Sequence, residues 1–330
     1  MHQLNRRRFL QLTAGGVAAG AVYKFGGFFG GTPHILKTRP VVKYSMAELR
    51  KLKISVHGWN DPKRFFPPLM EALFRSMQRD GLNVFWARHN QPVDSDMVVS
   101  CCWIQDNVIA DAQKHNKNVL VMEQGYIQPR NKWPSLAFNG LARYAIYPPS
   151  PQDGGARFNQ FFGDYLKPWR RKDDGYVLLV GQLPWDKSLY GLNMNAWLQE
   201  QADRLLGQGI EVVYRPHPVL LEISRATRKP YFVPEGARLS RSTLADDIAG
   251  AAYTVMYSST TAVESVLAGV PAVVTCDGAI AWEVTSHDLG HPIFQPDRSA
   301  WCADLAWKQW RLEELEDGTA WEHTKQAILV

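Results

Sequence analysis

The chain has 330 residues, a length typical of two domains of ordinary size. With 45% hydrophobic and 21% charged residues, and four cysteines without metal-ligand spacing, it is neither intrinsically disordered, nor a disulfide scaffold, nor a zinc ribbon. The formal net charge is +5, but it is unevenly distributed: residues 1–53 contribute +9, with ten Lys/Arg and one acid, and residues 54–330 contribute −4. This second part, the body of the protein, therefore lacks the basic surplus typical of nucleic-acid binding.

The basic surplus lies in a leader that we assign to residues 1–31, followed by a linker over residues 32–50. Arg6-Arg7-Arg8-Phe9-Leu10 and the Gly/Ala-rich stretch after it resemble a twin-arginine export signal. Ala19-Gly20-Ala21 has the small-x-small form of a cleavage site. Three interpretations stay open: an exported protein, an uncleaved leader that holds the protein at the cytoplasmic face of a membrane, and a basic tail with a chance resemblance.

The next part of the chain alternates apolar runs with amphipathic segments. Runs rich in β-branched residues predict strands over Leu52–Trp59, Leu82–Ala87, Met97–Trp103 and Asn118–Met122. Apolar positions three and four apart predict helices over residues 67–80 and 107–116. This order predicts a parallel sheet with helices on both faces, in an N-terminal domain over residues 51–150.

A segment rich in proline, glycine and basic residues, 151–175, is predicted to be an interdomain linker. Alternation then restarts, with predicted strands Tyr176–Val180, Ile210–Tyr214, Tyr253–Tyr257 and Ala272–Cys276 and helices Asn195–Leu206 and Thr261–Leu267. A long helix is expected from Ala303 to about Leu329. The fold class is therefore α/β, with two Rossmann-like doubly wound domains, 51–150 and 176–302, that face a cleft, and a C-terminal helix over 303–330. Ligands of such sheets bind at the carboxyl ends of the strands.

Two strand ends of the second domain predict a phosphate site. Arg215 and His217 follow the strand Ile210–Tyr214, and the prolines on both sides of His217 stiffen their backbone. A guanidinium presents a fixed fork to phosphate oxygens, and an imidazole can donate to a leaving group. A structural turn with a hydrogen-bonded histidine is the alternative.

The second strand end carries Ser258-Ser259-Thr260-Thr261 before a helix that contains Glu264. Hydroxyls and free N–H groups at a helix start can bind an anion, although Ser and Thr also serve as ordinary caps. Gly181 and Gln182 end the matching strand of the same domain. We assign eight residues to the binding of a donor phosphate or nucleotide: Arg215, Ser258, Ser259, Thr260, Thr261, Gly181, Gln182 and Glu264.

The first domain supplies a carboxylate at a strand end. Glu123, just after the strand Asn118–Met122, would face the cleft from the other side, where a general base for an acceptor hydroxyl would stand. A solvated or capping glutamate is the alternative. The candidate acceptor rim consists of His57, Trp59, Asn60, Tyr126 and Arg130.

Motifs for other chemistries are missing from the sequence. It lacks the Gly-x-Gly-x-x-Gly of dinucleotide folds, the Walker pattern and the Gly-x-Ser-x-Gly elbow of α/β-hydrolases. Asp94 and Asp96 precede a strand rather than end one, and no His/Cys/carboxylate cluster supports a metal. We therefore expect no metal and no cofactor other than a nucleotide sugar as co-substrate.

The order of these motifs resembles glycosyltransferases of the GT-B type, in particular bacterial capsule-polysaccharide, Kdo and sialic-acid transferases, and also phage-borne glycosyltransferase-like proteins. Glu123-Gln124-Gly125, His217-Pro218 and Ser258-Ser259 match the acidic-acidic-Gly, His-Pro and Ser-Ser/Thr motifs of those families, except that Gln124 stands where an acid is usual. The resemblance implies that Glu123 is the catalytic base and that His217 supports the leaving phosphate. It also implies that the serines bind that phosphate.

The leading hypothesis is metal-independent transfer of a sugar from a nucleotide sugar, CMP-linked rather than UDP-linked, to a hydroxyl of a glycan or surface polysaccharide. A second hypothesis is an exported two-domain protein that binds a small ligand, which an export signal would favour because nucleotide sugars are cytoplasmic. A third hypothesis is a phage glycosyltransferase that acts on DNA bases. The net charge of −4 on the body of the protein disfavours binding to nucleic acid, although the basic cluster over 167–172 could contact it.

Overall fold

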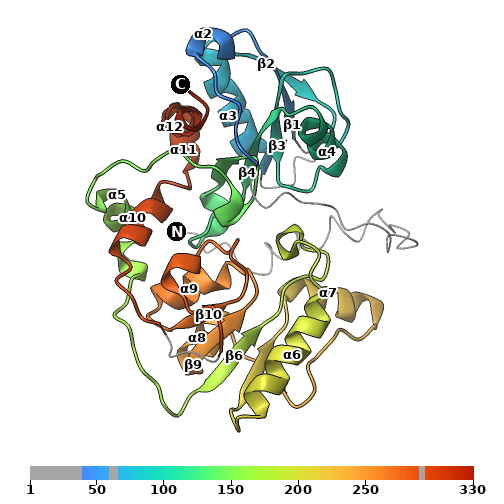
Figure 1. Ribbon diagram of the computed structural model, residues 1–330, viewed down its shortest axis with the longest axis vertical. Coiled ribbons are helices and arrows are strands. Elements are labelled where there is room, and N and C mark those ends of the chain that lie inside the picture. The colour runs from blue at the N-terminus through green and yellow to red at the C-terminus, as the bar shows by residue number, and fades with distance from the viewer. Residues whose placement is uncertain (1–38, 59–65, 290–293) are drawn as a thin grey trace, which may run out of the picture.

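The computed structural model describes residues 39–58, 66–289 and 294–330, and it consists of two α/β lobes (Figure 1). Trp59 and Asn60 of the predicted acceptor rim, and the leader over residues 1–31, lie outside the described residues. No helix of the described part is long and apolar enough to cross a membrane.

The N-terminal lobe is built on a five-stranded sheet in the order β2-β1-β3-β4-β5. Its strands are β1 (Lys53–His57), β2 (Asn83–Ala87), β3 (Met97–Cys101), β4 (Asn118–Glu123) and β5 (Ser135–Phe138). The first four are parallel, as predicted, and β5 is an antiparallel edge strand that the sequence pattern did not reveal. The helices of this lobe are α2 (Met46–Leu49), α3 (Phe66–Arg79) and α4 (Asp106–Lys114).

Helix α3 shows how the positions of proline, glycine and apolar residues determine where a helix begins, where it ends and which face it buries. Pro67 and Pro68 occupy its first turn, where a missing N–H costs no hydrogen bond. The helix ends before Gly81, whose φ of +80° is a left-handed conformation that glycine adopts without strain. Its buried apolar face, which includes Leu73 and Met77, packs into the main core of the lobe.

The C-terminal lobe holds an all-parallel sheet in the order β10-β9-β6-β7-β8. Its strands are β6 (Tyr176–Val180), β7 (Val212–Arg215), β8 (Arg238–Leu239), β9 (Ala251–Met256) and β10 (Ala272–Val274). Its helices are α6 (Met194–Leu206), α7 (Pro218–Thr227), α8 (Leu244–Gly250) and α9 (Thr261–Leu267). Two separate buried clusters pack on this sheet, so the predicted α/β fold of two Rossmann-like domains is confirmed.

The carboxyl ends of the two sheets face each other. Gln128 and Arg130, beyond the end of β4, contact the start of α9, which follows β9. Lys187, beyond the end of β6, forms an ion pair of 2.9 Å with Asp106, which follows β3. The carboxyl ends of the two sheets, where ligands of such sheets commonly bind, therefore lie opposite each other.

Both predicted linkers are more structured than expected. The described part of the first linker packs on the N-terminal lobe, because the Val42 N–H donates to Asn118 Oδ1 (2.9 Å) and Tyr44 forms a β-bridge with Leu329. The second contains α5 (Ala156–Phe162), whose Arg157 and aromatic side chains are buried against the C-terminal part of the chain. Glycine and proline content alone did not reveal these contacts.

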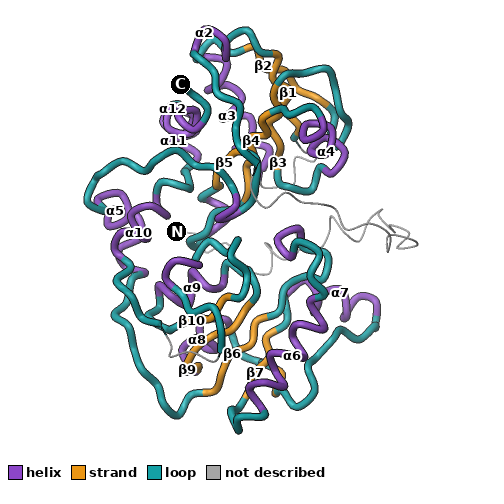
Figure 2. Tube along the Cα trace, viewed as in Figure 1, coloured by secondary structure: helices purple, strands orange, loops and turns teal. Residues whose placement is uncertain are grey.

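The prediction of one long C-terminal helix over 303–330 is wrong. The chain forms three short helices, α10 (Ser299–Ala306), α11 (Leu312–Glu316) and α12 (Thr319–Thr324), and α11 and α12 lie against α3 of the N-terminal lobe (Figures 1 and 2). The first break forms where the Trp310 N–H donates to the Pro134 carbonyl (2.9 Å), and the second lies at Gly318, with φ of +99°. Short 3-10 helices occur at η1 (Arg130–Lys132), η2 (Ala142–Tyr144), η3 (Gly163–Tyr165), η4 (Lys187–Leu189), η5 (Trp282–Val284) and η6 (Lys325–Ala327).

Candidate active site

Glu123 is the last residue of β4, and its half-buried carboxylate is held by three donors. The Gln124 N–H donates to Oε1 (3.0 Å), the Trp103 N–H donates to Oε2 (3.4 Å), and the Cys102 thiol donates as well. Burial raises the pKa of Glu123, and the charge of Asp186 from the other lobe adds to this, while the three donors lower the pKa. The net effect is a pKa above the ordinary value, which suits a carboxylate that must accept a proton.

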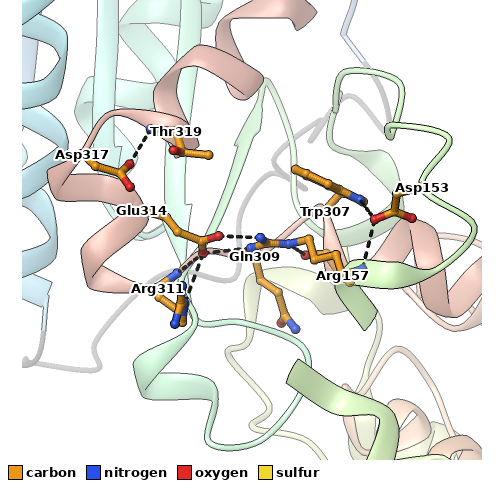
Figure 3. Close-up of polar contacts among 9 residues, drawn as sticks. Asp153, Arg157, Trp307, Gln309, Arg311, Glu314, Asp317 and Thr319 are labelled. Carbon is orange, nitrogen blue, oxygen red and sulfur yellow. Dashed lines mark hydrogen bonds and ion pairs between the residues drawn. The ribbon is translucent and has the colours of Figure 1, made fainter. Parts of the chain in front are cut away.

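The loop that follows Glu123 is rigidly built. The Gly125 N–H donates to the Arg130 carbonyl (3.1 Å), which closes the loop. A Cβ at Gly125 would lie 1.8 Å from the Trp133 carbonyl oxygen, so only glycine fits. Gln309, fully buried and located in the C-terminal segment (Figure 3), accepts the next two backbone N–H groups of the loop at 2.8 and 3.1 Å.

The same loop reaches the other lobe. Arg130 donates through Nη1 to Thr260 Oγ1, and Gln128 donates through Nε2 to Glu264 Oε1 (3.1 Å). Arg130 was predicted to line the acceptor rim, but the structure places its guanidinium at the start of α9, beside the predicted phosphate site. The predicted donor residues Thr260 and Glu264 are thus in contact with the N-terminal lobe.

His217 is the N-cap residue of α7, and its ring orientation is defined. Its Nδ1 accepts a hydrogen bond from the Val219 N–H (3.2 Å), so in the neutral ring Nε2 carries the proton and is the donor. Burial lowers the pKa of His217; the charge of Asp186 raises it and that of Arg130 lowers it, and the net direction is downward. The side chain is therefore a neutral N–H donor near pH 7.

Arg215 is the last residue of β7, and its role at the donor phosphate stays a prediction. Arg215 Nη1 bonds to Asp247 Oδ2 (2.5 Å) and to the Ser242 carbonyl (2.9 Å), and the Asp247 side chain is only 3% exposed. A buried carboxylate needs a paired cation, so Arg215 neutralises Asp247 through Nη1, which reduces the positive charge that it could offer to a phosphate.

Ser258 and Gln182, which the sequence assigns to the donor, are buried and bond to each other, so their contact with a donor stays a prediction. Gln182 is buried, and its amide bonds to the Ser258 N–H (2.9 Å) and hydroxyl (3.1 Å). The Ser258 hydroxyl donates to the Ser188 carbonyl (2.9 Å). These bonds lie between the ends of β6 and β9, where the strand order of the sheet reverses. Gly181 is needed for packing, because a Cβ there would lie 2.8 Å from the Tyr214 hydroxyl.

The remaining hydroxyl residues stay candidates for the anion site. Ser259 Oγ accepts the Thr261 N–H (3.2 Å) and donates to Thr261 Oγ1 (3.1 Å), so the two side chains form a local turn. Within the described residues, the backbone N–H groups of Ser259 and Thr260 have no acceptor. Two unused N–H groups lie next to Thr260 Oγ1, which the Arg130 guanidinium contacts, and successive backbone N–H groups of this kind can bind an anion.

The acceptor rim differs from the prediction. His57 is completely buried, with Nδ1 at 2.9 Å from the Arg88 carbonyl and Nε2 at 3.0 Å from Ser55 Oγ, so it cannot reach a ligand. Tyr126 is also buried, and its hydroxyl lies 2.6 Å from the Tyr147 hydroxyl, which places it behind the site rather than on a rim.

Sequence reasoning missed three residues that shape the site. Asp186 lies beyond the end of β6, where its charge acts on both Glu123 and His217, but a single acid in a Pro-Trp-Asp turn carries no recognisable signal. Cys102 belongs to the four cysteines whose spacing carries no signal, and Gln309 lies in the segment predicted to be one helix. Among the described residues, no group of three or more His, Cys, Asp or Glu could hold a metal ion.

No protein-family model and no curated protein matches the sequence. Among solved structures, the protein is similar to Thermosulfurimonas dismutans KpsC, beta Kdo 2,4 transferase, with a TM-score of 0.51 and 15% identity over 77% of this chain and 90% of that one. It is also similar to Thermosulfurimonas dismutans KpsC, beta Kdo 2,7 transferase, with a TM-score of 0.47 and 12% identity over 81% and 98% of the two chains. The first likeness shows that the chain has the expected GT-B-like fold.

Proposed function

We propose that the protein is a glycosyltransferase that moves a sugar from a nucleotide sugar to a hydroxyl of a glycan or surface polysaccharide. The observation that carries this proposal is that two different groups, one from each lobe, both lie within reach of the Asp186 charge. The N-terminal sheet contributes the Glu123 carboxylate, and the C-terminal sheet contributes the Nε2–H donor of His217. An acid-base pair from two lobes suits a reaction that joins two substrates, one held by each lobe.

In this proposal, Glu123 accepts the proton of the acceptor hydroxyl while the acceptor oxygen attacks the anomeric carbon. The bond from that carbon to the phosphate oxygen breaks, and the nucleotide phosphate leaves with the electron pair. His217 donates a hydrogen bond to the departing oxygen, and Arg130 and the N–H groups of Ser259 and Thr260 stabilise its charge. No step requires a metal or a further cofactor.

The donor is proposed to be CMP-linked rather than UDP-linked. The motif order supports this choice, and so does the fold likeness to a protein described as a Kdo transferase. The acceptor is proposed to be a glycan. In the basic cluster over 167–172, two of the four basic side chains have partners within the protein: Arg170 donates to three backbone carbonyls, and Arg171 pairs with Asp173 at 2.6 Å.

The test is a panel of CMP-, UDP- and GDP-sugars, with release of free nucleotide and thermal stabilisation as the two readouts. We expect one donor class to be consumed in the presence of a glycan acceptor, and Glu123→Gln and His217→Ala each to lower kcat about 100-fold or more. Glu200→Gln, on the exposed surface of α6, is the matched control and leaves the rate unchanged. If no donor is consumed and none raises the Tm, the proposal is wrong.

The site of action is proposed to be the cytoplasmic face of a membrane, with the leader as an uncleaved attachment. Nucleotide sugars are cytoplasmic, which supports this location over export by the twin-arginine route. Cell fractionation with N-terminal sequencing distinguishes the two. A periplasmic product cleaved after Ala21 would favour the alternative, an exported protein that binds a small ligand between its two lobes.

A further inference from the structure

Two features of Tyr190, in the loop between β6 and α6, lower the stability of the protein. Its backbone has a φ of +51° and a ψ of +37°, a left-handed conformation that is strained for a bulky side chain. Its hydroxyl is buried, and it has no hydrogen-bond partner among the described residues. Backbone strain and an unmade hydrogen bond persist together chiefly where a residue serves a function.

The unmade hydrogen bond is a property of Tyr190 and not of its surroundings. The Tyr190 ring meets the edge of the Tyr144 ring, with centroids 5.0 Å apart. The Tyr144 hydroxyl donates to Asp277, and the hydroxyls of Tyr126 and Tyr147 lie 2.6 Å apart. Of these four phenols, only that of Tyr190 keeps an unused donor.

The backbone that carries the Tyr190 side chain is held on both sides. Leu189, directly before it, is 2% exposed in the core around α6, and Leu192 packs on the same core. The Tyr190 N–H donates to the Lys187 carbonyl (3.3 Å), which closes the turn. The fold therefore fixes the direction in which the phenol projects.

The loop that carries Tyr190 also reaches the candidate active site. It contains Asp186, whose charge acts on the candidate base Glu123 and on His217. The same charge acts on Tyr190. Tyr144, against which the ring packs, follows β5 of the N-terminal lobe, so Tyr190 lies where the two lobes meet. The side chain as a whole is partly exposed, and separation of the lobes would uncover its hydroxyl.

The surroundings of the hydroxyl favour a neutral oxygen as its partner. Burial raises the pKa of Tyr190, so the phenol stays protonated near pH 7 and acts as a hydrogen-bond donor. The nearby charge of Asp186 disfavours an anionic partner such as a phosphate oxygen. A sugar hydroxyl or the carbonyl of a base meets both conditions.

We propose that Tyr190 is a positioning residue whose hydroxyl donates a hydrogen bond to a neutral oxygen of the nucleotide sugar, in its sugar or in its base. The assignment rests on the proposed function, because that function makes the nucleotide sugar the ligand. Strain and the unmade bond in the free protein hold a donor ready for this ligand. Removal of the hydroxyl should therefore stabilise the free protein and weaken its binding of the ligand.

The test measures both properties of Tyr190→Phe in the full-length protein. We expect the Tm without ligand to rise by about 1–3 °C, because phenylalanine has no hydroxyl to leave unpaired. Calorimetry with CMP-sialic acid, UDP-N-acetylglucosamine and GDP-mannose should show that the affinity for the donor that binds falls about 3- to 10-fold, the effect of one neutral hydrogen bond. Titration with the matching nucleotide alone locates the oxygen: a loss that persists lies in the nucleotide, and a loss confined to the nucleotide sugar lies in the sugar.

Tyr147→Phe is the matched control, because it removes a hydroxyl that has a partner. It should lower the Tm and leave the affinity for the donor unchanged. A merely structural role of Tyr190 would move its stability and its affinity in the same direction.

An unchanged affinity of Tyr190→Phe would overturn the assignment and leave the proposed transferase standing, and so would a loss of affinity accompanied by a lower Tm. Failure of the parent protein to bind any of the three nucleotide sugars would overturn both proposals. A parent protein that binds a nucleotide sugar through Tyr190 but transfers no sugar would keep the assignment, while the proposed transferase fails.

Discussion

At the scale of single residues, opposing influences determine the pKa of the Glu123 carboxylate. Burial and the nearby charge of Asp186 favour its protonated form, whereas the two backbone N–H groups and the Cys102 thiol favour the carboxylate. The thiol is the one donor that a substitution can remove without changing the backbone. Cys102 has a left-handed φ of +63°, which alanine and serine tolerate about as well as cysteine, so the substitution tests the hydrogen bond itself.

We predict that Cys102→Ala shifts the pH dependence of the proposed transfer. A general base acts as the carboxylate, so kcat/KM rises with pH through the pKa of Glu123. Loss of a donor to the carboxylate raises that pKa further, and the rising limb moves to higher pH. Cys102→Ser keeps a donor and should leave the limb near its original position. The pH profile of kcat/KM checks this, and a shift of the alanine variant to lower pH would contradict the assigned role of the thiol.

The sequence predicted where a side chain lies better than it predicted which group that side chain bonds to. Glu123 and His217 could be selected because they follow buried strands, and the ends of parallel strands meet at one edge. Arg215 satisfied the same rule, but its partner Asp247 lies on a helix 32 positions later. Likewise, His57 ends a strand but points into the core, where Ser55 and a loop carbonyl use both ring nitrogens. Such long-range pairing leaves no local pattern in a sequence.

At the scale of elements, the predicted strands and helices agree with the structure within a few residues wherever burial follows a simple period. The buried strands β3 and β4 are continuous apolar runs, and α3 has a regular apolar stripe. The sequence pattern did not reveal α2, β5, α7, β8 and α8, and it also failed at α5 and in the helices of the C-terminal segment. There, Arg157 is fixed by contacts with Trp307 and Trp310, with its guanidinium carbon 4.8 Å from each ring centroid. These elements form because of tertiary contacts, which override local propensity.

We predict that Glu314→Gln on α11 destabilises the protein by about 3–5 kcal/mol, the usual cost of breaking a buried ion pair from one side. Glu314 Oε2 accepts from Arg157 Nη2 at 2.9 Å, and both side chains are buried (Figure 3). The substitution leaves the Arg157 charge without its partner. Urea unfolding measures the cost, and Glu313→Gln, an exposed neighbour on the same helix, should change the free energy of unfolding by no more than about 0.5 kcal/mol. Equal effects of the two variants would show that the pair contributes nothing.

At the scale of the whole molecule, the position of a segment in the sequence does not tell which lobe it packs in. The last part of the chain crosses back to the first lobe, where Trp310, Leu315 and Trp321 complete the core formed around β1 and α3. The C-terminal end of the chain therefore lies on the N-terminal lobe (Figure 1). The cluster around β1 and α3 belongs to the N-terminal lobe and the cluster around α6 belongs to the C-terminal lobe, while a third cluster joins Tyr126 and Trp133 to β9 and α9. We expect the first two clusters to open as separate cooperative units.

Two matched substitutions test this assignment. Leu315→Ala and Leu205→Ala each remove a fully buried leucine from a helix, the first in the core of the N-terminal lobe and the second in a core of the C-terminal lobe. Each should cost about 2–5 kcal/mol. Although residue 315 lies near the end of the chain, Leu315→Ala should speed hydrogen exchange in β1 and β3 and leave β6 and β7 protected. Leu205→Ala should do the reverse. If both variants speed exchange in both sheets equally, the lobes unfold as one unit, and the cleft between them is then a rigid groove rather than a joint between independent domains.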